Sequence, residues 1–322
     1  MNLIEPIQIT EQLWSVETVP FLQVHIVTYN HENFIINCIE GVLLQKTTFP
    51  VQLLILDDAS TDRTVEILIE YSNKHSNLIK IFLQNENTYG KENINYYRSE
   101  FYNSFNGKYI AFCEGDDYWT DPLKLQRQVD FLEKNGNVVL SAENGLTKNF
   151  ITNKEYLFNK EIEEKYYSAY EMLQSRRFPT ASVVFRTEYI KDILKLKYTA
   201  DTAMWVLLST KGLVHYNPIV SSVYNRNLNG LVSGTDKLTW AKNTEKWDNQ
   251  IIKIIKESSS NKSFDYSIFK KRNYREYFNS YTYYNWLKST KKKYLCFLKC
   301  FTMRPIYTIA KITYHSIKKQ TH

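Results

Sequence analysis

Short apolar runs that end in acidic residues constrain the fold of this chain most. Residues 51–56 (Val-Gln-Leu-Leu-Ile-Leu) are almost continuously apolar and lead directly into Asp57 and Asp58. Such a run is typical of a strand covered on both faces, as in a parallel sheet. We expect further strands of this sheet at 22–29, 78–83, 108–113 and 138–140.

Segments with helical periodicity separate these strands. The clearest has Leu125, Val129 and Leu132 at positions i, i+4 and i+7. Other helices are expected through 35–44, after a cap at Ser60, and over 91–105. Alternation of strand and helix from 22 to 140 predicts an α/β fold with a mostly parallel central sheet flanked by helices.

The pattern becomes less regular after residue 141. Ser168 and Glu171 have the spacing of a capping box and predict a short helix. The sequence beyond them predicts strands at 181–186, 214–216 and 219–224, a helix at 203–209, and mostly helix after 236. We therefore expect a main α/β domain over 1–235 and a basic, aromatic helical extension over 236–322.

Charge is distributed unevenly along the 322 residues. Residues 1–240 contain 23 Lys and Arg against 29 Asp and Glu, whereas residues 241–322 contain 18 against 5. Basic residues mixed with aromatic ones over 264–322 suit an anionic membrane surface. The alternative is a helical face that packs on the main domain or forms an oligomer contact. Nucleic acid is not an expected partner, because the carboxylates predicted below at the strand ends form an acidic crevice that would repel its phosphates.

Several features predict a cytoplasmic protein, located peripherally at the inner face of the membrane if the extension binds lipid. The N-terminus has no basic start followed by an apolar run, and no apolar stretch is long enough to span a bilayer. The four cysteines form no C-x-x-C pair, so buried, reduced thiols are expected. His25 lies between apolar residues on a predicted strand and is expected in the core.

Polar residues that suit phosphate chemistry follow three of the predicted strands. Tyr29 follows the first strand, Asp57 and Asp58 the second, and Glu114 to Asp117 the fourth. Ligands of open α/β sheets bind at the carboxyl ends of strands. So many carboxylates in one crevice need a compensating cation, and a hard divalent metal also binds phosphate oxygens. No G-x-G-x-x-G or P-loop motif is present, so the phosphates are not expected in a glycine cradle.

These motifs, in this order and spacing, resemble an inverting GT-A glycosyltransferase of family 2. The resemblance covers roughly 22–235 and depends on Val-Thr-Tyr-Asn, Leu-Asp-Asp-Ala-Ser-Thr-Asp and Glu-Gly-Asp-Asp-Tyr-Trp. It implies a nucleotide-binding half at 22–140, an acceptor half at 141–235, and a nucleoside-diphosphate sugar donor, usually UDP-linked. The implied acceptor is a glycan or lipid-linked sugar of bacterial surface polysaccharide biosynthesis.

The resemblance also implies roles around the nucleotide. Tyr29 would contact the base, with Val27 and Glu32 near it. Asp57 would accept a hydrogen bond from the base or ribose, and Asp58 would support the loop.

The Glu-Gly-Asp-Asp segment would take the place of the family's Asp-x-Asp motif. Glu114 would face the ribose, and Asp116 would bind Mn²⁺ or Mg²⁺ at the diphosphate. Asp117 would support the metal ligand without contacting the metal itself. Arg226 lies in a segment that lacks the family's usual histidine, and it would hold the diphosphate instead. Asp201, in Ala-Asp-Thr-Ala-Met-Trp, would be the catalytic base.

Each residue also has a structural interpretation. Tyr29 could belong to the core, the Asp57-Asp58 pair could cap a turn, and Asp201 could cap a helix. A surface salt bridge is the alternative for Arg226. At the level of function, the alternatives are a nucleotidyltransferase, an inactive sugar-nucleotide-binding relative and a membrane-surface scaffold.

Overall fold

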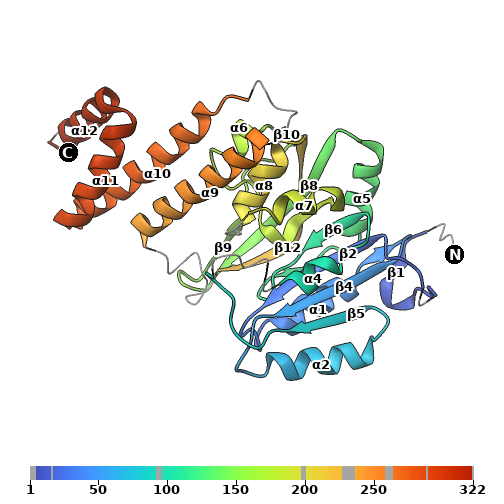
Figure 1. The fold of residues 1–322 in the computed structure, drawn as a ribbon. Helices are drawn as coiled ribbons and strands as arrows, with labels where there is room; N and C mark the ends of the chain where they lie inside the picture. Colours follow the sequence, from blue (N-terminus) through green and yellow to red (C-terminus); the bar gives the residue numbers. More distant parts are fainter. Residues whose placement is uncertain are drawn as a thin grey trace. The chain divides into compact units, whose positions relative to one another are not determined.

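We analysed a computed structural model of the chain. It describes residues 5–15, 17–91, 96, 98–196, 201–226, 236–257, 264–287 and 289–320, with side chains to 312. The chain divides into two compact units, residues 1–228 and 229–322, and each is described separately. Figure 1 shows a strand-rich first unit and a helical second unit.

The first unit contains a long mixed sheet. Its strands are β2 (Leu22–Thr28), β4 (Val51–Asp57), β5 (Ile79–Leu83), β6 (Tyr109–Phe112), β7 (Tyr118–Trp119), β8 (Val138–Asn149), β9 (Lys154–Leu157), β10 (Lys165–Tyr167), β11 (Val183–Arg186) and β12 (Leu213–Arg226). They follow the order β10-β12-β8-β11-β6-β2-β4-β5, with β7 paired to β12 and β9 to β8. A separate small ribbon joins β1 (Ile7–Gln8) to β3 (Lys46–Thr47).

Parallel pairing dominates the half of the sheet that the sequence predicts most clearly. β6, β2, β4 and β5 are parallel neighbours, and β8 is parallel to β12. β11 runs antiparallel between β6 and β8 and joins the two parallel groups. The predicted α/β class, with a mostly parallel central sheet flanked by helices, is confirmed.

Helices cover both faces of this sheet. They are α1 (Ile35–Leu43), α2 (Thr64–Lys74), α4 (Ser99–Asn103), α5 (Lys124–Lys134), α6 (Ala169–Met172), α7 (Ile190–Ile193) and α8 (Asp201–Ser209), with short 3-10 turns at Ile9–Glu11, Thr180–Ser182 and Thr187–Tyr189. Apolar residues of α1, α2 and α5 pack on one face with alternate residues of β2 and β4. Aromatic residues of α4 and α8 lie on the other face, where Phe112 contacts Trp205 and His25.

The second unit is a helical assembly with its own small core. Its helices are α9 (Lys237–Glu257), α10 (Ser267–Trp286), α11 (Thr290–Met303) and α12 (Pro305–Gln320). Tyr274, Tyr277 and Phe278 of α10 pack with Cys296 and Cys300 of α11. No described helix of the chain combines the length and hydrophobicity that a membrane crossing requires.

Some local predictions are wrong. β8 extends to Asn149 rather than ending at 140, because it pairs along its length with β12. The two strands predicted at 214–224 are one strand with irregular pairing between Asn217 and Ser222. Ser60 does not cap α2, which begins at Thr64; its hydroxyl donates to Asp57 instead. Only 99–103 of the helix predicted over 91–105 is described as a regular helix.

Other local predictions are confirmed. Ser168 and Glu171 form the reciprocal hydrogen bonds of a capping box. The four cysteines are buried and unpaired. His25 is only 7% exposed and lies in the core, within ring-contact distance of Phe101 and Phe112.

His25 makes the stability of the first unit depend on pH. Burial, aided by Arg98, lowers the pKa of His25 to about 3, so the folded chain holds a neutral imidazole. The unfolded chain binds a proton below pH 6.5, and stability is therefore lost as pH falls from 6.5 toward 3. Between pH 7 and 5 this loss is about 2 kcal/mol. We expect His25→Phe to abolish this loss, so that its free energy of unfolding falls by about 2 kcal/mol less than that of the wild type between pH 7 and pH 5. Denaturant unfolding at the two pH values measures the difference, and an equal fall in both proteins would contradict the prediction.

Candidate active site

The acidic loop at Glu114–Asp117 is held against the end of β2. It leaves β6 at Cys113, and the Gly115 amide donates to the Val27 carbonyl over 3.0 Å. A Cβ at Gly115 would lie 2.6 Å from the Thr28 hydroxyl oxygen and 2.8 Å from Nδ1 of His31. Only glycine fits this close approach, and it fixes the acids on either side at the strand ends.

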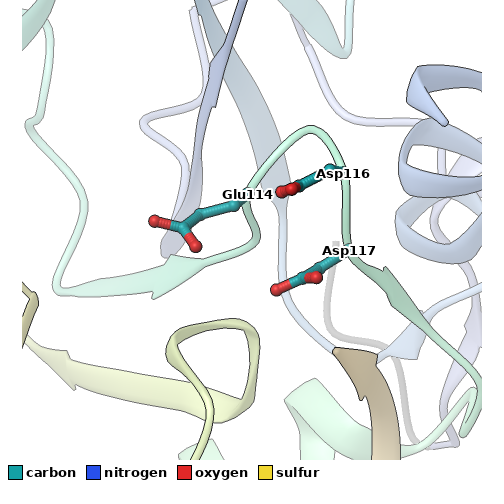
Figure 2. A group of neighbouring side chains, drawn as sticks. All are labelled: Glu114, Asp116 and Asp117. Atoms are coloured by element: carbon teal, nitrogen blue, oxygen red, sulfur yellow. The ribbon is translucent and has the colours of Figure 1, made fainter. Parts of the chain in front are cut away.

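Three carboxylates of this loop form a cluster. Oxygens of Glu114, Asp116 and Asp117 lie within 4.8 Å of one another. Figure 2 shows Asp116 and Asp117 on one limb of the loop, with their side chains directed toward the limb that carries Glu114. Burial, together with the charges of Asp201 and Asp116, raises the pKa of Glu114 to about 8. Burial also raises the pKa of Asp117 well above its usual range. So much confined negative charge favours a bound cation.

Asp117 has one unpaired oxygen. Its Oδ1 accepts a hydrogen bond of 2.9 Å from the Asn225 amide, whereas its Oδ2 is buried without a partner. The Asn225 side chain donates to the Asp116 carbonyl over 2.6 Å. β12 thereby braces the loop from the side where it pairs with β7. A buried orphan carboxylate oxygen is a site that a divalent metal or a donor group would satisfy.

The predicted base-binding residues lie around the ends of β2 and β4. Tyr29 is 42% exposed, so it does not belong to the core. Asn30, with a φ of 53°, accepts a hydrogen bond from the Thr61 amide over 2.8 Å. Glu32 accepts one from the Arg63 amide over 3.1 Å. These contacts join the turn after β2 to the turn after β4, and they leave Tyr29 open to a ligand.

The two aspartates after β4 have different surroundings. Asp57 accepts hydrogen bonds from the amide and hydroxyl of Ser60, and burial raises its pKa. Asp58 forms a buried ion pair with Arg98 at 3.1 Å and also accepts from Thr88. Both Asp58 oxygens are thus committed to neighbouring groups. Both Asp57 oxygens accept from Ser60 in the same way, and the Asp57 side chain is equally buried. The contact of Asp57 with a ligand therefore stays a prediction.

Asp201 begins α8 and interacts with an arginine that the sequence analysis did not single out. Arg176 forms an ion pair with Asp201 at 2.8 Å. Burial raises the pKa of Asp201, but Arg176 and hydrogen bonds from Thr180 and Thr202 bring it below its usual value. The Asp201 carboxylate is therefore ionised, as a general base must be. Ala200 lies outside the described residues, as does the 230–233 segment.

The described site therefore contains both expected and unexpected residues. Glu114 and Asp201 influence each other electrostatically, as do His31 and Asp116. Arg226 is exposed at the end of β12, immediately after the bracing Asn225. Arg176, His31 and Asn225 were missed because each lies far along the chain from the acidic loop.

Comparisons with known proteins identify the family of the chain. Residues 23–194, more than half of the chain, match the family model for glycosyl transferase family 2. An uncharacterized protein of Mycobacterium tuberculosis is 41% identical over 108 residues, but the match covers only 34% of this chain and 30% of that protein. The chain therefore aligns with about a third of the length of the first such relatives.

Two further proteins resemble larger parts of the chain. WfaP of Escherichia coli, named UDP-Glc:alpha-D-GlcNAc-diphosphoundecaprenol beta-1,3-glucosyltransferase, is 29% identical over 65% of this chain and 78% of its own. The crystal structure of S. aureus TarS 1-349 in complex with UDP-GlcNAc has a TM-score of 0.65 at 16% identity, over 90% of this chain and 83% of that one. Its likeness concerns the fold. By the family match, this chain belongs to glycosyl transferase family 2.

Proposed function

We propose that this protein transfers a sugar from a nucleoside-diphosphate donor, UDP-linked, to a glycan or lipid-linked acceptor, with inversion at the anomeric carbon. The observation that carries the proposal is the carboxylate cluster of Glu114, Asp116 and Asp117 at the strand ends of a family 2 domain. The names of WfaP and TarS, which include UDP-sugars, support the choice of base.

The cluster fits a divalent metal. Carboxylate oxygens are the ligands that Mn²⁺ and Mg²⁺ prefer, and the buried Oδ2 of Asp117 has no protein partner. A mannosyltransferase of Pyrobaculum calidifontis whose fold resembles this one, with a TM-score of 0.55, was solved with GDP-Man and Mn²⁺. We assign Asp116 as the principal ligand, with Asp117 behind it. When bound, the metal would neutralise charge on the diphosphate leaving group.

The remaining contacts with the donor are assigned from position. Tyr29 would contact the base, with Val27 and Glu32 beside it. Asp57 would accept a hydrogen bond from the base or ribose, while Asp58 holds the turn through Arg98. In addition, Glu114 would face the ribose, and Arg226 would approach the diphosphate from the end of β12.

The transfer step needs one carboxylate base. We assign this role to Asp201: it accepts the proton of the acceptor hydroxyl as that oxygen forms a bond to C1 of the sugar. The bond from C1 to the diphosphate oxygen breaks, and the nucleoside diphosphate leaves with the bonding electrons. A single displacement of this kind inverts the configuration at C1.

We extend the proposal to the organisation of the chain. Residues 1–235 would form the GT-A domain, with a nucleotide-binding half at 22–140 and an acceptor half at 141–235. Residues 236–322 would form the helical extension. The product would be a surface polysaccharide or lipid-linked glycan of a bacterium, made at the cytoplasmic face of the membrane. WfaP, whose named acceptor is a diphosphoundecaprenol, supports this kind of substrate.

Nucleotide-induced stabilisation tests the proposed function. UDP, GDP, dTDP and CMP would each be added with and without Mn²⁺, and the melting temperature would be measured. We expect UDP to raise it strongly in the presence of Mn²⁺ and much less without metal, because a ligand that binds only the folded state stabilises it. The absence of a shift with every nucleotide would overturn the proposal and favour a scaffold role.

The helical extension has a surface suited to an anionic membrane. Along α11, Cys296 and Cys300 are buried, whereas Leu298 and Phe301 are each 39% exposed. On α12, Ile306 is 84% exposed. The chain has no Asp or Glu after Glu276 but nine Lys and Arg. Exposed apolar side chains beside an excess of basic residues are typical of helices that lie on anionic bilayers.

Vesicle binding tests this membrane proposal. The full chain should sediment with vesicles of phosphatidylcholine and phosphatidylglycerol, and much less with phosphatidylcholine alone. Lys291→Gln with Lys293→Gln should weaken this binding about 30-fold, because each basic residue contributes about 1 kcal/mol at an anionic surface. Lys292 is left unchanged because it pairs with Asp236. Leu123→Ser, at an exposed site in the first unit, is the control. Equal binding to both kinds of vesicle would contradict the proposal.

A further inference from the structure

We propose that Arg176 and Thr180 are positioning residues that aim the Asp201 carboxylate at the acceptor; this inference rests on the proposed function. Two contacts converge on one oxygen of Asp201, and a third joins the two donors. Arg176 Nη2 lies 2.8 Å from Asp201 Oδ2 and donates to the Thr180 hydroxyl over 3.0 Å. The Thr180 hydroxyl in turn donates to the same Oδ2 over 2.6 Å. The three side chains form a closed triangle.

The second oxygen of Asp201 is held from its own helix. The Thr202 amide donates to Oδ1 over 2.6 Å, and Asp201 is the first residue of α8. Unpaired amides at a helix N-terminus favour a negative charge there. Contacts at both oxygens therefore fix the rotation of the carboxylate. Oδ2 is committed to Arg176 and Thr180, so the acceptor hydroxyl would approach Oδ1, which among the described residues only Thr202 contacts.

Two aromatic rings fix Arg176 itself. The carbon of its guanidinium lies 5.2 Å from the ring centre of Phe158 and 5.2 Å from that of Tyr224. A planar, delocalised cation suits such contacts, and lysine does not reproduce them together with a directed hydrogen bond. Tyr224 immediately precedes Asn225, which braces the acidic loop. The arginine is thus tied to the same strand that holds the metal-binding segment.

The positive charge of Arg176 balances the negative charge of the carboxylates around it. Asp201 lies near enough to Glu114 for the charge of one carboxylate to act on the other. Arg176 interacts favourably with both Asp201 and Glu114. Removing it would leave the proposed base facing like charge without compensation. We therefore expect Arg176 to act on the transfer step through Asp201 and to have little effect on nucleotide binding.

Enzyme kinetics with UDP release as the readout tests this role. UDP-glucose and UDP-GlcNAc would be incubated with Mn²⁺ and the full chain, and their hydrolysis measured, with water as the acceptor. We expect kcat to fall about 100-fold in Arg176→Ala and about tenfold in Arg176→Lys, while the UDP dissociation constant changes less than threefold. Arg177→Ala is the matched control, since the neighbouring arginine contacts the Glu171 carbonyl and not Asp201.

A double-mutant cycle separates positioning from general support of the structure. If Arg176 acts through Asp201, Arg176→Ala should cause little further loss in an Asp201→Asn background. Additive losses, an unchanged kcat in Arg176→Ala, or a loss confined to UDP affinity would each overturn the inference. Thr180→Val removes a hydroxyl without changing charge and should lower kcat about tenfold even if Arg176→Ala does not fold. A wild-type chain that neither binds UDP nor releases it would instead overturn the proposed function.

Discussion

Asp116→Asn is expected to reduce sugar transfer at least a thousandfold while leaving the fold intact. Replacing the carboxylate by a neutral amide weakens the metal site, and the metal contributes several kcal/mol to the stability of the charged transition state. The measurement is kcat/KM for UDP release at saturating Mn²⁺. The backbone carbonyl that accepts from Asn225 is retained, so the bracing contact with β12 survives.

A stability measurement controls for misfolding in this variant. Asp116 lies among like charges, so its neutralisation should not lower the melting temperature of the metal-free chain. Asp130→Asn, an identical change at an exposed site on α5, should retain full activity. Transfer by Asp116→Asn at the wild-type rate would remove Asp116 from the metal site.

Asp201→Asn is the second change with a large expected effect. The amide cannot accept the proton of the attacking hydroxyl, and a general base contributes roughly 10²- to 10⁴-fold to a rate. We expect kcat for transfer to fall by that factor, with the dissociation constant of UDP in the presence of Mn²⁺ nearly unchanged. This pattern separates Asp201 from Asp116, whose replacement weakens both binding and turnover. A retained kcat would assign the base to another residue.

The part of the fold nearest the N-terminus was the most predictable from sequence. In β2 and β4, nearly every residue is buried, and such strands read as continuous apolar runs. The C-terminal part of β8 was missed because Glu143 and Asn144 are buried polar residues. Glu143 is satisfied by Arg127 from α5, a contact that only the folded chain provides. A polar strand whose partners lie elsewhere in the sequence carries no periodic signal.

The same reasoning explains which site residues could be found. Glu114, Asp116 and Asp117 are adjacent in sequence and follow a strand, so a local motif reveals them. Arg176 is separated from Asp201 by 25 positions and from the acidic loop by about 60, in a segment without regular periodicity. The contact of Arg176 with Asp201 depends on how the chain before β11 folds back toward α8. Such a pairing is a property of the tertiary structure.

Isothermal titration of UDP, with and without Mn²⁺, tests the central claim most directly. The account places a metal-dependent nucleotide-diphosphate site at the acidic loop. It predicts that the wild-type chain binds UDP at least ten times more tightly with Mn²⁺, and that Asp116→Asn abolishes this difference. Metal-independent binding of UDP, equal in the wild type and in Asp116→Asn, would contradict it.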